Sequence, residues 1–285
     1  MVVRRADTLG MCSGVRSALA LVDRALRDNP DTPVSTLGPL VHNTAVVAEY
    51  RARGVAPVEA PSEIASGILV LRTHGVAPGV RAAFERPGLR VVDATCPNVR
   101  RIHNLVTDHE SRGFTVVVVG DPAHDEVRGI AGHVRNPMVI ATAAEAETAD
   151  IAMPAFVVGQ TTLSREAYEA VCAVVRRRFP GVLIADTTCP STERRRESLL
   201  RLAERVDALV VIGGKTSANT RWLYEAARST GRPSWLIEGP AELPDGIAGF
   251  GSVGITAGAS TPDRLVDAVE AALLALAEKP TAAGQ

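Results

Sequence analysis

Hydrophobic residues recur along this chain in two alternating patterns, short β-branched runs and longer segments with helical spacing. The short runs predict strands at 33–37, 67–71, 89–93, 114–119, 138–141, 155–158, 182–185, 208–212, 234–237 and 253–256. The longer segments predict helices at 14–26, 44–53, 98–111, 126–132, 165–178, 192–205, 219–229 and 262–277. Because strands and helices alternate almost without interruption, the sequence predicts an α/β protein with mostly parallel sheets.

One short pattern occurs twice, a β-branched strand followed by Asp, Ala or Thr, Thr and a Cys-Pro step. It reads VVDATCP at 91–97 and IADTTCP at 184–190. A third cysteine, Cys12, lies in another predicted strand-end loop, GMCSG at 10–14. Cys12, Cys96 and Cys189 therefore mark the start of each third of the chain.

Composition limits what these thiols can do. A chain of 285 residues, 46% hydrophobic, can bury more than one core, so we expect two or three α/β lobes. The 31 basic and 32 acidic residues give a net charge of -1, which favours neither nucleic acid nor a membrane surface as partner. No apolar run reaches membrane-spanning length, and residues 1–7 lack the apolar core of a signal peptide, so we expect a cytoplasmic location.

In a reducing cytoplasm, cysteines far apart in sequence are more often metal-bound, catalytic or buried than disulfide-bonded. Cys172 fits simple burial because it lies inside a predicted helix. The other three thiols share a strand-end position, which indicates function. Three thiolates from three lobes would suit an iron-sulfur cluster with one iron open to substrate. Zinc is the competing metal, but the cysteines form no Cys-x-x-Cys pair.

Polar side chains gather where predicted strands end, and in parallel sheets this is where ligands bind. Each alone is compatible with an ordinary helix cap or a structural histidine. Together with helix-start N–H groups they suit a phosphorylated substrate without a net basic surface. The set comprises His42 and Asn43, His74, His124 to Glu126, Gln160 to Thr162, Thr216 to Asn219, and Ala259 to Pro262.

Seven ordered motifs between Gly10 and Asp263 carry a family resemblance. They are CSGV at 12–15, GPLVHN at 38–43, THGV at 73–76, DATCP at 93–97, HDEV at 124–127, QTTL at 160–163 and TAGAS at 256–260. On these motifs the chain resembles the IspH (LytB) family, the 4-hydroxy-3-methylbut-2-enyl diphosphate reductases of non-mevalonate isoprenoid biosynthesis.

The resemblance implies three pseudo-threefold-related lobes around a central 4Fe-4S cluster held by Cys12, Cys96 and Cys189. We place these lobes at 1–95, 96–188 and 189–277, with a tail at 278–285 that we expect to be disordered. The implied diphosphate-binding residues are His42, His74, Ser217, Asn219 and Ser260, with His124 lining the pocket.

The resemblance also implies a proton donor, Glu126, and a neighbouring hydroxyl, Thr161, that orients the substrate. Two electrons from a ferredoxin- or flavodoxin-type donor, with protons, would remove the allylic hydroxyl as water and leave isopentenyl and dimethylallyl diphosphates. Reductive loss of a hydroxyl needs a Lewis acid, an electron source and a proton donor, and this set would supply all three.

Some positions depart from the family pattern. These are Thr8-Leu9 before Gly10, Arg100-Arg101, the run 192–196, Ala218 and Arg221-Trp222. Alternative functions are therefore a diverged paralogue with a related phosphorylated substrate and an iron-sulfur sensor without turnover. The retained Glu126 and Thr161 argue against a sensor, which needs the thiols but no placed proton donor. For the arginine run 194–196 we expect solvation, as is usual for charges on a helix.

Overall fold

The computed structural model describes residues 1–278 and separates into two compact units. The first unit comprises Met1–Ser13, Val41–Glu49 and the residues from Pro190 on. The second unit comprises Gly14–Leu40 and Tyr50–Cys189. Of the predicted tail at 278–285, residues 279–285 lie outside the described residues, and the expected disorder is wrong for Glu278, which is the last residue of a helix.

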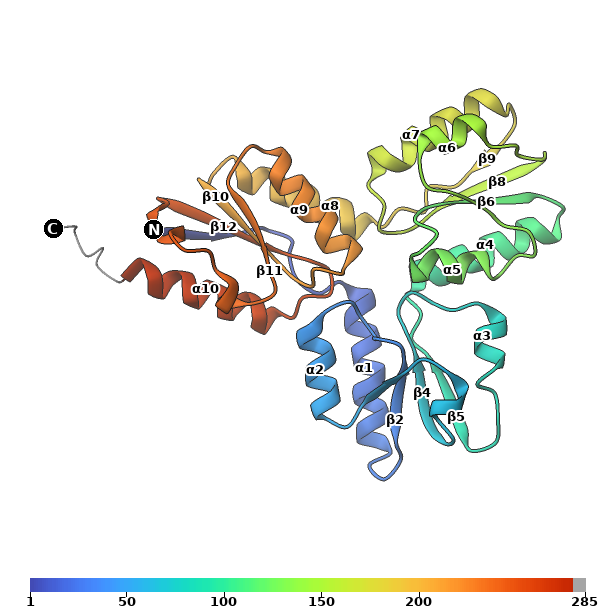
Figure 1. Cartoon of the computed structure of the whole chain (residues 1–285), viewed down its shortest axis with the longest axis horizontal. Helices are drawn as coiled ribbons and strands as arrows, with labels where there is room; N and C mark the ends of the chain where they lie inside the picture. The colour runs from blue at the N-terminus through green and yellow to red at the C-terminus, as the bar shows by residue number, and fades with distance from the viewer. Residues whose placement is uncertain (279–285) are drawn as a thin grey trace. The chain divides into compact units, whose positions relative to one another are not determined.

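The first unit contains a parallel four-stranded sheet in the order β1-β12-β10-β11. Its strands are β1 (Val2–Arg5), β10 (Ala208–Ile212), β11 (Ser234–Ile237) and β12 (Ser252–Ala257). Its helices are α8 (Pro190–Ala203), α9 (Ala218–Ser229) and α10 (Asp263–Glu278). Helix α10 covers one face of this sheet, and α8 and α9 cover the other (Figure 1).

Successive residues of β10 point to opposite faces of this sheet, as strand geometry requires. Ala208, Val210 and Ile212 pack in the cluster with α10, whereas Leu209 and Val211 pack with α8 and α9. All five are fully buried. The continuous apolar run of β10 therefore reflects a strand that is covered on both sides.

The second unit contains two further parallel four-stranded sheets, β3-β2-β4-β5 and β7-β6-β8-β9. Their strands are β2 (Val34–Leu37), β3 (Ala56–Val58), β4 (Gly67–Leu71), β5 (Leu89–Asp93), β6 (Thr115–Val119), β7 (Met138–Ile140), β8 (Ala155–Gly159) and β9 (Leu183–Ile184). The helices are α1 (Ser13–Asp28), α2 (Thr44–Ala52), α3 (Pro78–Ala82), α4 (Pro97–Ser111), α5 (Asp125–Ala131), α6 (Ala143–Thr148) and α7 (Arg165–Arg178), of which α1 begins and α2 largely lies in the first unit.

The three sheets share one strand order. In each, the first strand lies second, flanked by the next strand on one side and by the third and fourth on the other. The fourth strand is β5 in one sheet and β9 in another, and β1 takes this place in the sheet of β10, β11 and β12. In Figure 1, the blue β1 lies beside β12 at the red end of the colour scale.

The predicted α/β class and parallel sheets are confirmed, as are all the predicted helices and strands, with ends that shift by a few residues. The strands and α-helices missing from the prediction are β1, β3, α3 and α6, which have three to six residues each. The domain division at 95/96 and 188/189 stays a prediction. Strand pairing puts β1, which that division counts with the first lobe, in the sheet of residues 208–257.

Among residues 1–278, no helix combines the length and the apolar character that crossing a bilayer requires.

The core of the first unit is stabilised by close packing of side chains between β10 and the helices that cover it. We expect Leu209→Ala to lower the free energy of unfolding by about 2–5 kcal/mol, because Leu209 is fully buried and its removal leaves a cavity. Urea unfolding measures the change. Leu274→Ala, at a leucine on α10 that is 45% exposed, is the matched control and should change stability by less than about 0.5 kcal/mol. Equal losses for both variants would contradict this packing.

Candidate functional site

Three cysteines occupy the same place in the three sheets. Each follows the fourth strand of its sheet, an edge strand, and directly precedes the first residue of a helix. Cys12 precedes α1, Cys96 precedes α4 and Cys189 precedes α8. All three are half-buried. The N–H groups at a helix start favour negative charge nearby, which suits thiolate ligands.

The peptide N–H of each cysteine donates to a carbonyl in the loop after the neighbouring strand. In the first unit, the Cys12 N–H donates to Ala259 at 3.0 Å. In the second unit, Cys96 donates to Thr73 and Cys189 donates to Thr161, both at 2.9 Å. These loops carry Ser260, His74 and Thr161 of the predicted substrate site. Each thiol is thereby tethered to a loop with predicted substrate contacts.

An identical turn precedes Cys96 and Cys189. Asp93 Oδ1 accepts from both the N–H and the hydroxyl of Thr95, at 2.9 and 2.5 Å. Asp186 Oδ1 accepts from the same two groups of Thr188, at 3.1 and 2.6 Å. These bonds fix the last loop residue before each thiol, so the repeated sequence pattern encodes a repeated cysteine placement.

Cys172 differs from the other three cysteines. It lies inside α7 and is fully buried, as the sequence predicts. Burial raises the pKa of its thiol to about 11. A thiol that stays protonated in an apolar core is inert, so Cys172 is a packing residue.

Glu126 is a buried carboxylate, only 1% exposed, on the first turn of α5. Thr161 donates to both of its oxygens, through its N–H to Oε1 at 2.6 Å and through its hydroxyl to Oε2 at 2.8 Å. Burial raises the pKa of Glu126 to about 7, and the two bonds from Thr161 oppose that rise. Near neutral pH this group can therefore hold or release a proton.

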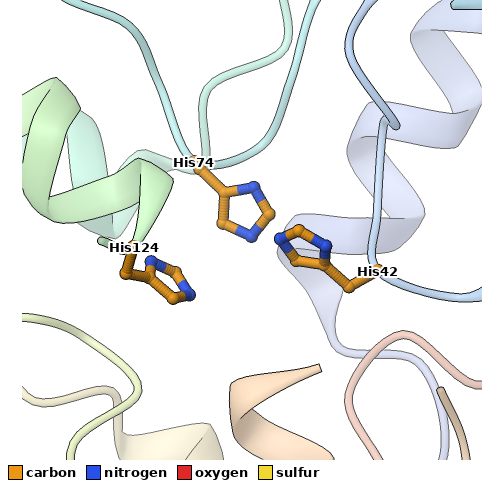
Figure 2. Close-up of side chains that lie close together, drawn as sticks. All are labelled: His42, His74 and His124. Atoms are coloured by element: carbon orange, nitrogen blue, oxygen red, sulfur yellow. The ribbon is translucent and has the colours of Figure 1, made fainter. Parts of the chain in front are cut away.

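His124 caps α5, and its Nδ1 accepts the N–H of Glu126 at 3.1 Å. With Nδ1 occupied as an acceptor, the neutral ring carries its proton on Nε2. The His74 ring lies edge-on to His124, with centroids 5.5 Å apart (Figure 2). The second unit thus brings together His74, His124, Glu126 and Thr161 beside the loops of Cys96 and Cys189.

Arg72 and Asp125 connect the loop of His74 to the start of α5. Arg72 Nη1 lies 3.1 Å from Asp125 Oδ2, and both side chains are about four-fifths buried, at 18% and 22% exposure. The loop also approaches α4 closely at Gly75, whose φ is +70°, since a Cβ there would lie 2.4 Å from the His103 ring. These contacts fix the backbone on which His74 is carried.

The predicted substrate residues of the first unit also lie together. Ser217 caps α9 by accepting the N–H of Thr220 at 3.4 Å. Asn219 Oδ1 accepts the N–H of Ala259 at 3.0 Å, and Ser260 donates to the carbonyl of His42 at 3.4 Å. The loops that carry Ser217, Asn219, Ser260 and His42 therefore form one hydrogen-bonded group.

The expectation that the arginine run 194–196 is solvated is wrong for Arg195, which is only 3% exposed. Its guanidinium donates to the carbonyl of Gly10 and to the carbonyl and hydroxyl of Ser191. Arg195 thus supports the loop before Cys12. Arg194 is exposed and Arg196 is half-buried. Helical position could have distinguished Arg195 from them, because it lies one turn after Ser191.

The family model described as LytB protein matches residues 3–274. The chain belongs to the LytB family. This confirms the family resemblance on which the predicted function rests. The 4-hydroxy-3-methylbut-2-enyl diphosphate reductase of Treponema denticola is 37% identical over 96% of this chain and 99% of its own length. The reductase of the same name from Treponema pallidum is 39% identical over 95% of this chain and 83% of its own length.

Solved structures support the LytB fold. The structure of the E-1-hydroxy-2-methyl-but-2-enyl-4-diphosphate reductase from Plasmodium falciparum matches with a TM-score of 0.90 at 23% identity, and the match covers 98% of this chain and 89% of that one. A structure of (E)-4-hydroxy-3-methyl-but-2-enyl diphosphate reductase, described as the terminal enzyme of the non-mevalonate pathway, matches with a TM-score of 0.74 at 34% identity over 96% of this chain and all of that one.

The raised pKa of Glu126 predicts a pH-dependent stability. The folded state holds this proton up to about pH 7, whereas a glutamate in the unfolded chain releases it near 4.5. The contribution of Glu126 to the free energy of unfolding is therefore fully present below about pH 4.5 and is lost as the pH rises to about 7. Relative to Glu126→Gln, the free energy of unfolding of wild type should fall by about 3 kcal/mol across that interval. Urea unfolding at several pH values measures this change. Glu225→Gln, at an exposed glutamate of α9, should follow wild type. Parallel curves for wild type and Glu126→Gln would contradict the assignment.

Proposed function

We propose that this chain is a 4-hydroxy-3-methylbut-2-enyl diphosphate reductase of non-mevalonate isoprenoid biosynthesis. The reaction removes the allylic hydroxyl as water, consumes two electrons and two protons, and leaves isopentenyl and dimethylallyl diphosphates. Support comes from membership of the LytB family and from relatives of that name that match nearly the whole chain. The observation that carries the proposal is a buried carboxyl, Glu126, bonded by Thr161, whose carbonyl in turn accepts from a predicted cluster ligand, Cys189.

The proposed cofactor is a 4Fe-4S cluster held by Cys12, Cys96 and Cys189. The donor set fits such a group, because three soft thiol ligands occupy equivalent helix-start positions and none is sequestered in a core as Cys172 is. In the second unit the Asn98 amide, two residues after Cys96, reaches the sulfur of Cys189 at 3.4 Å. When bound, the cluster would supply electrons and a Lewis acid for the departing hydroxyl.

The proposed diphosphate ligands are the histidines and helix-start residues of the two units. In the first unit Ser217 is the N-cap of α9, where backbone N–H groups favour an anion, and Ser260 and His42 belong to the same bonded group. In the second unit His74 and His124 offer ring N–H donors. These donors would stabilise the charge of the diphosphate by local hydrogen bonds. Such a site needs no basic protein surface, which agrees with a net charge of only -1.

Glu126 is the proposed proton donor to the carbon skeleton or the leaving hydroxyl. With a pKa of about 7, it is substantially protonated at neutral pH, which an ordinary glutamate is not. The Thr161 hydroxyl can orient both this carboxyl and the substrate, and Arg72–Asp125 holds the adjoining turn. Because Glu126 is buried, water competes poorly for its proton.

We further propose a cytoplasmic protein of three α/β lobes, at 1–95, 96–188 and 189–277, that receives electrons from a ferredoxin- or flavodoxin-type donor. A diverged paralogue with a related phosphorylated substrate is the second candidate. The observation that favours it is Ala218 at the first position of α9, where a hydroxyl would otherwise be available to the diphosphate. Loss of one such hydrogen bond costs roughly 0.5–1.5 kcal/mol, which alters affinity and leaves the chemistry intact.

An anaerobic assay of reconstituted protein with the hydroxylated C5 diphosphate and a strong reductant tests this function. Wild type should turn over, and Glu126→Gln should lower kcat by about 10²–10⁴-fold with little change in KM, because only proton transfer is lost. The wild-type kcat should fall as pH rises above about 7, since Glu126 then loses its proton. Glu225→Gln should match wild type.

Full activity of Glu126→Gln with electron delivery not limiting would exclude the proton-donor role. Wild type that carries the cluster but does not turn over this substrate would favour the paralogue.

A further inference from the structure

Asn98 lies on the first turn of α4, two residues after Cys96, and its side-chain amide reaches a different cysteine. Asn98 Nδ2 donates to Cys189 Sγ at 3.4 Å, although the two residues are 91 positions apart in sequence. Side chains on a helix tilt toward its N-terminus, so the amide of a first-turn residue extends to the strand ends where the thiols lie. Asn98 is exposed to solvent.

The equivalent positions after the other two cysteines carry no such donor. Gly14, two residues after Cys12, has no side chain. Ser191, two residues after Cys189, accepts a hydrogen bond from Arg195 within its own helix. Among the positions that follow the described cysteines by two residues, Asn98 alone carries a side-chain amide, and that amide donates to a cysteine sulfur. The three cysteine loops therefore differ in the side chain two residues after the cysteine.

We infer that Asn98 raises the reduction potential of the cluster by donating a hydrogen bond to the sulfur of Cys189. The inference rests on the proposed cofactor. Reduction adds one electron to the cluster, with no bond formed or broken, and increases the negative charge shared by the ligating sulfurs. An N–H donor stabilises that added charge, so the reduced state gains more than the oxidised state. Asn98 acts through Cys189, so it is a positioning residue.

The test is anaerobic redox titration of the loaded protein, followed by visible absorbance and electron paramagnetic resonance. Asn98→Leu keeps the number of side-chain heavy atoms and their branching at Cγ, and it removes the donor. We expect the equilibrium constant for one-electron reduction to fall about threefold, which lowers the midpoint potential by about 30 mV at 59 mV per tenfold. Asn98→Asp replaces the donor with a negative charge and should lower the potential further.

Asn104 provides the matched control, because it is an exposed asparagine on the same helix, six residues or about 9 Å farther along. Asn104→Leu should leave the potential at the wild-type value. A wild-type potential in Asn98→Leu, with full iron content, would overturn the inference. If Asn98→Leu does not retain iron, Asn98→Asp is used instead, and a wild-type potential in that variant would overturn the inference. A wild-type protein that binds no cluster would overturn the proposed cofactor and this inference with it, whereas a loaded wild type with unchanged variants overturns the inference alone.

Discussion

The N–H of each helix-start cysteine donates to a carbonyl in the loop that follows the neighbouring parallel strand. This bond exists because parallel strands end at the same edge, so adjacent loops run side by side. It occurs at Cys12, Cys96 and Cys189, once in each sheet. Each of these bonds joins a cysteine to the loop that carries Ser260, His74 or Thr161, which are predicted substrate contacts.

The second constraint is the burial of Glu126. A carboxyl with 1% exposure would normally be destabilising, and Thr161 offsets part of that cost with two hydrogen bonds. The remaining cost appears as a pKa of about 7, which is the property that a proton donor needs at neutral pH. Because the Thr161 carbonyl also accepts the N–H of Cys189, the same residue holds the Glu126 carboxyl and the cysteine backbone.

The sequence predicted those parts of the fold that local patterns encode. Long apolar runs such as β10 and amphipathic helices such as α7 follow from periodicity alone. The strand β1 could not be found in this way, since Val2–Arg5 is short, basic and largely exposed, and only its pairing with β12 makes it a strand. The cysteines were predictable because they follow strand ends, and the Asp93 and Asp186 turns were implicit in the repeated pattern. The contacts of Asn98 with Cys189 and of Arg195 with Gly10 join residues 91 and 185 positions apart, and no local signal reveals them.

The central proposal is that three equivalent helix-start cysteines share one iron-sulfur cofactor and that the fourth cysteine takes no part. Iron and sulfide content after anaerobic reconstitution tests it most directly, measured on Cys12→Ser, Cys96→Ser, Cys189→Ser and the matched control Cys172→Ser. We expect each of the first three substitutions to deplete or destabilise the cluster, and we expect Cys172→Ser to bind iron and sulfide as wild type does. Full, stable cluster content in any of the first three variants, or loss of iron in folded Cys172→Ser, would contradict the account.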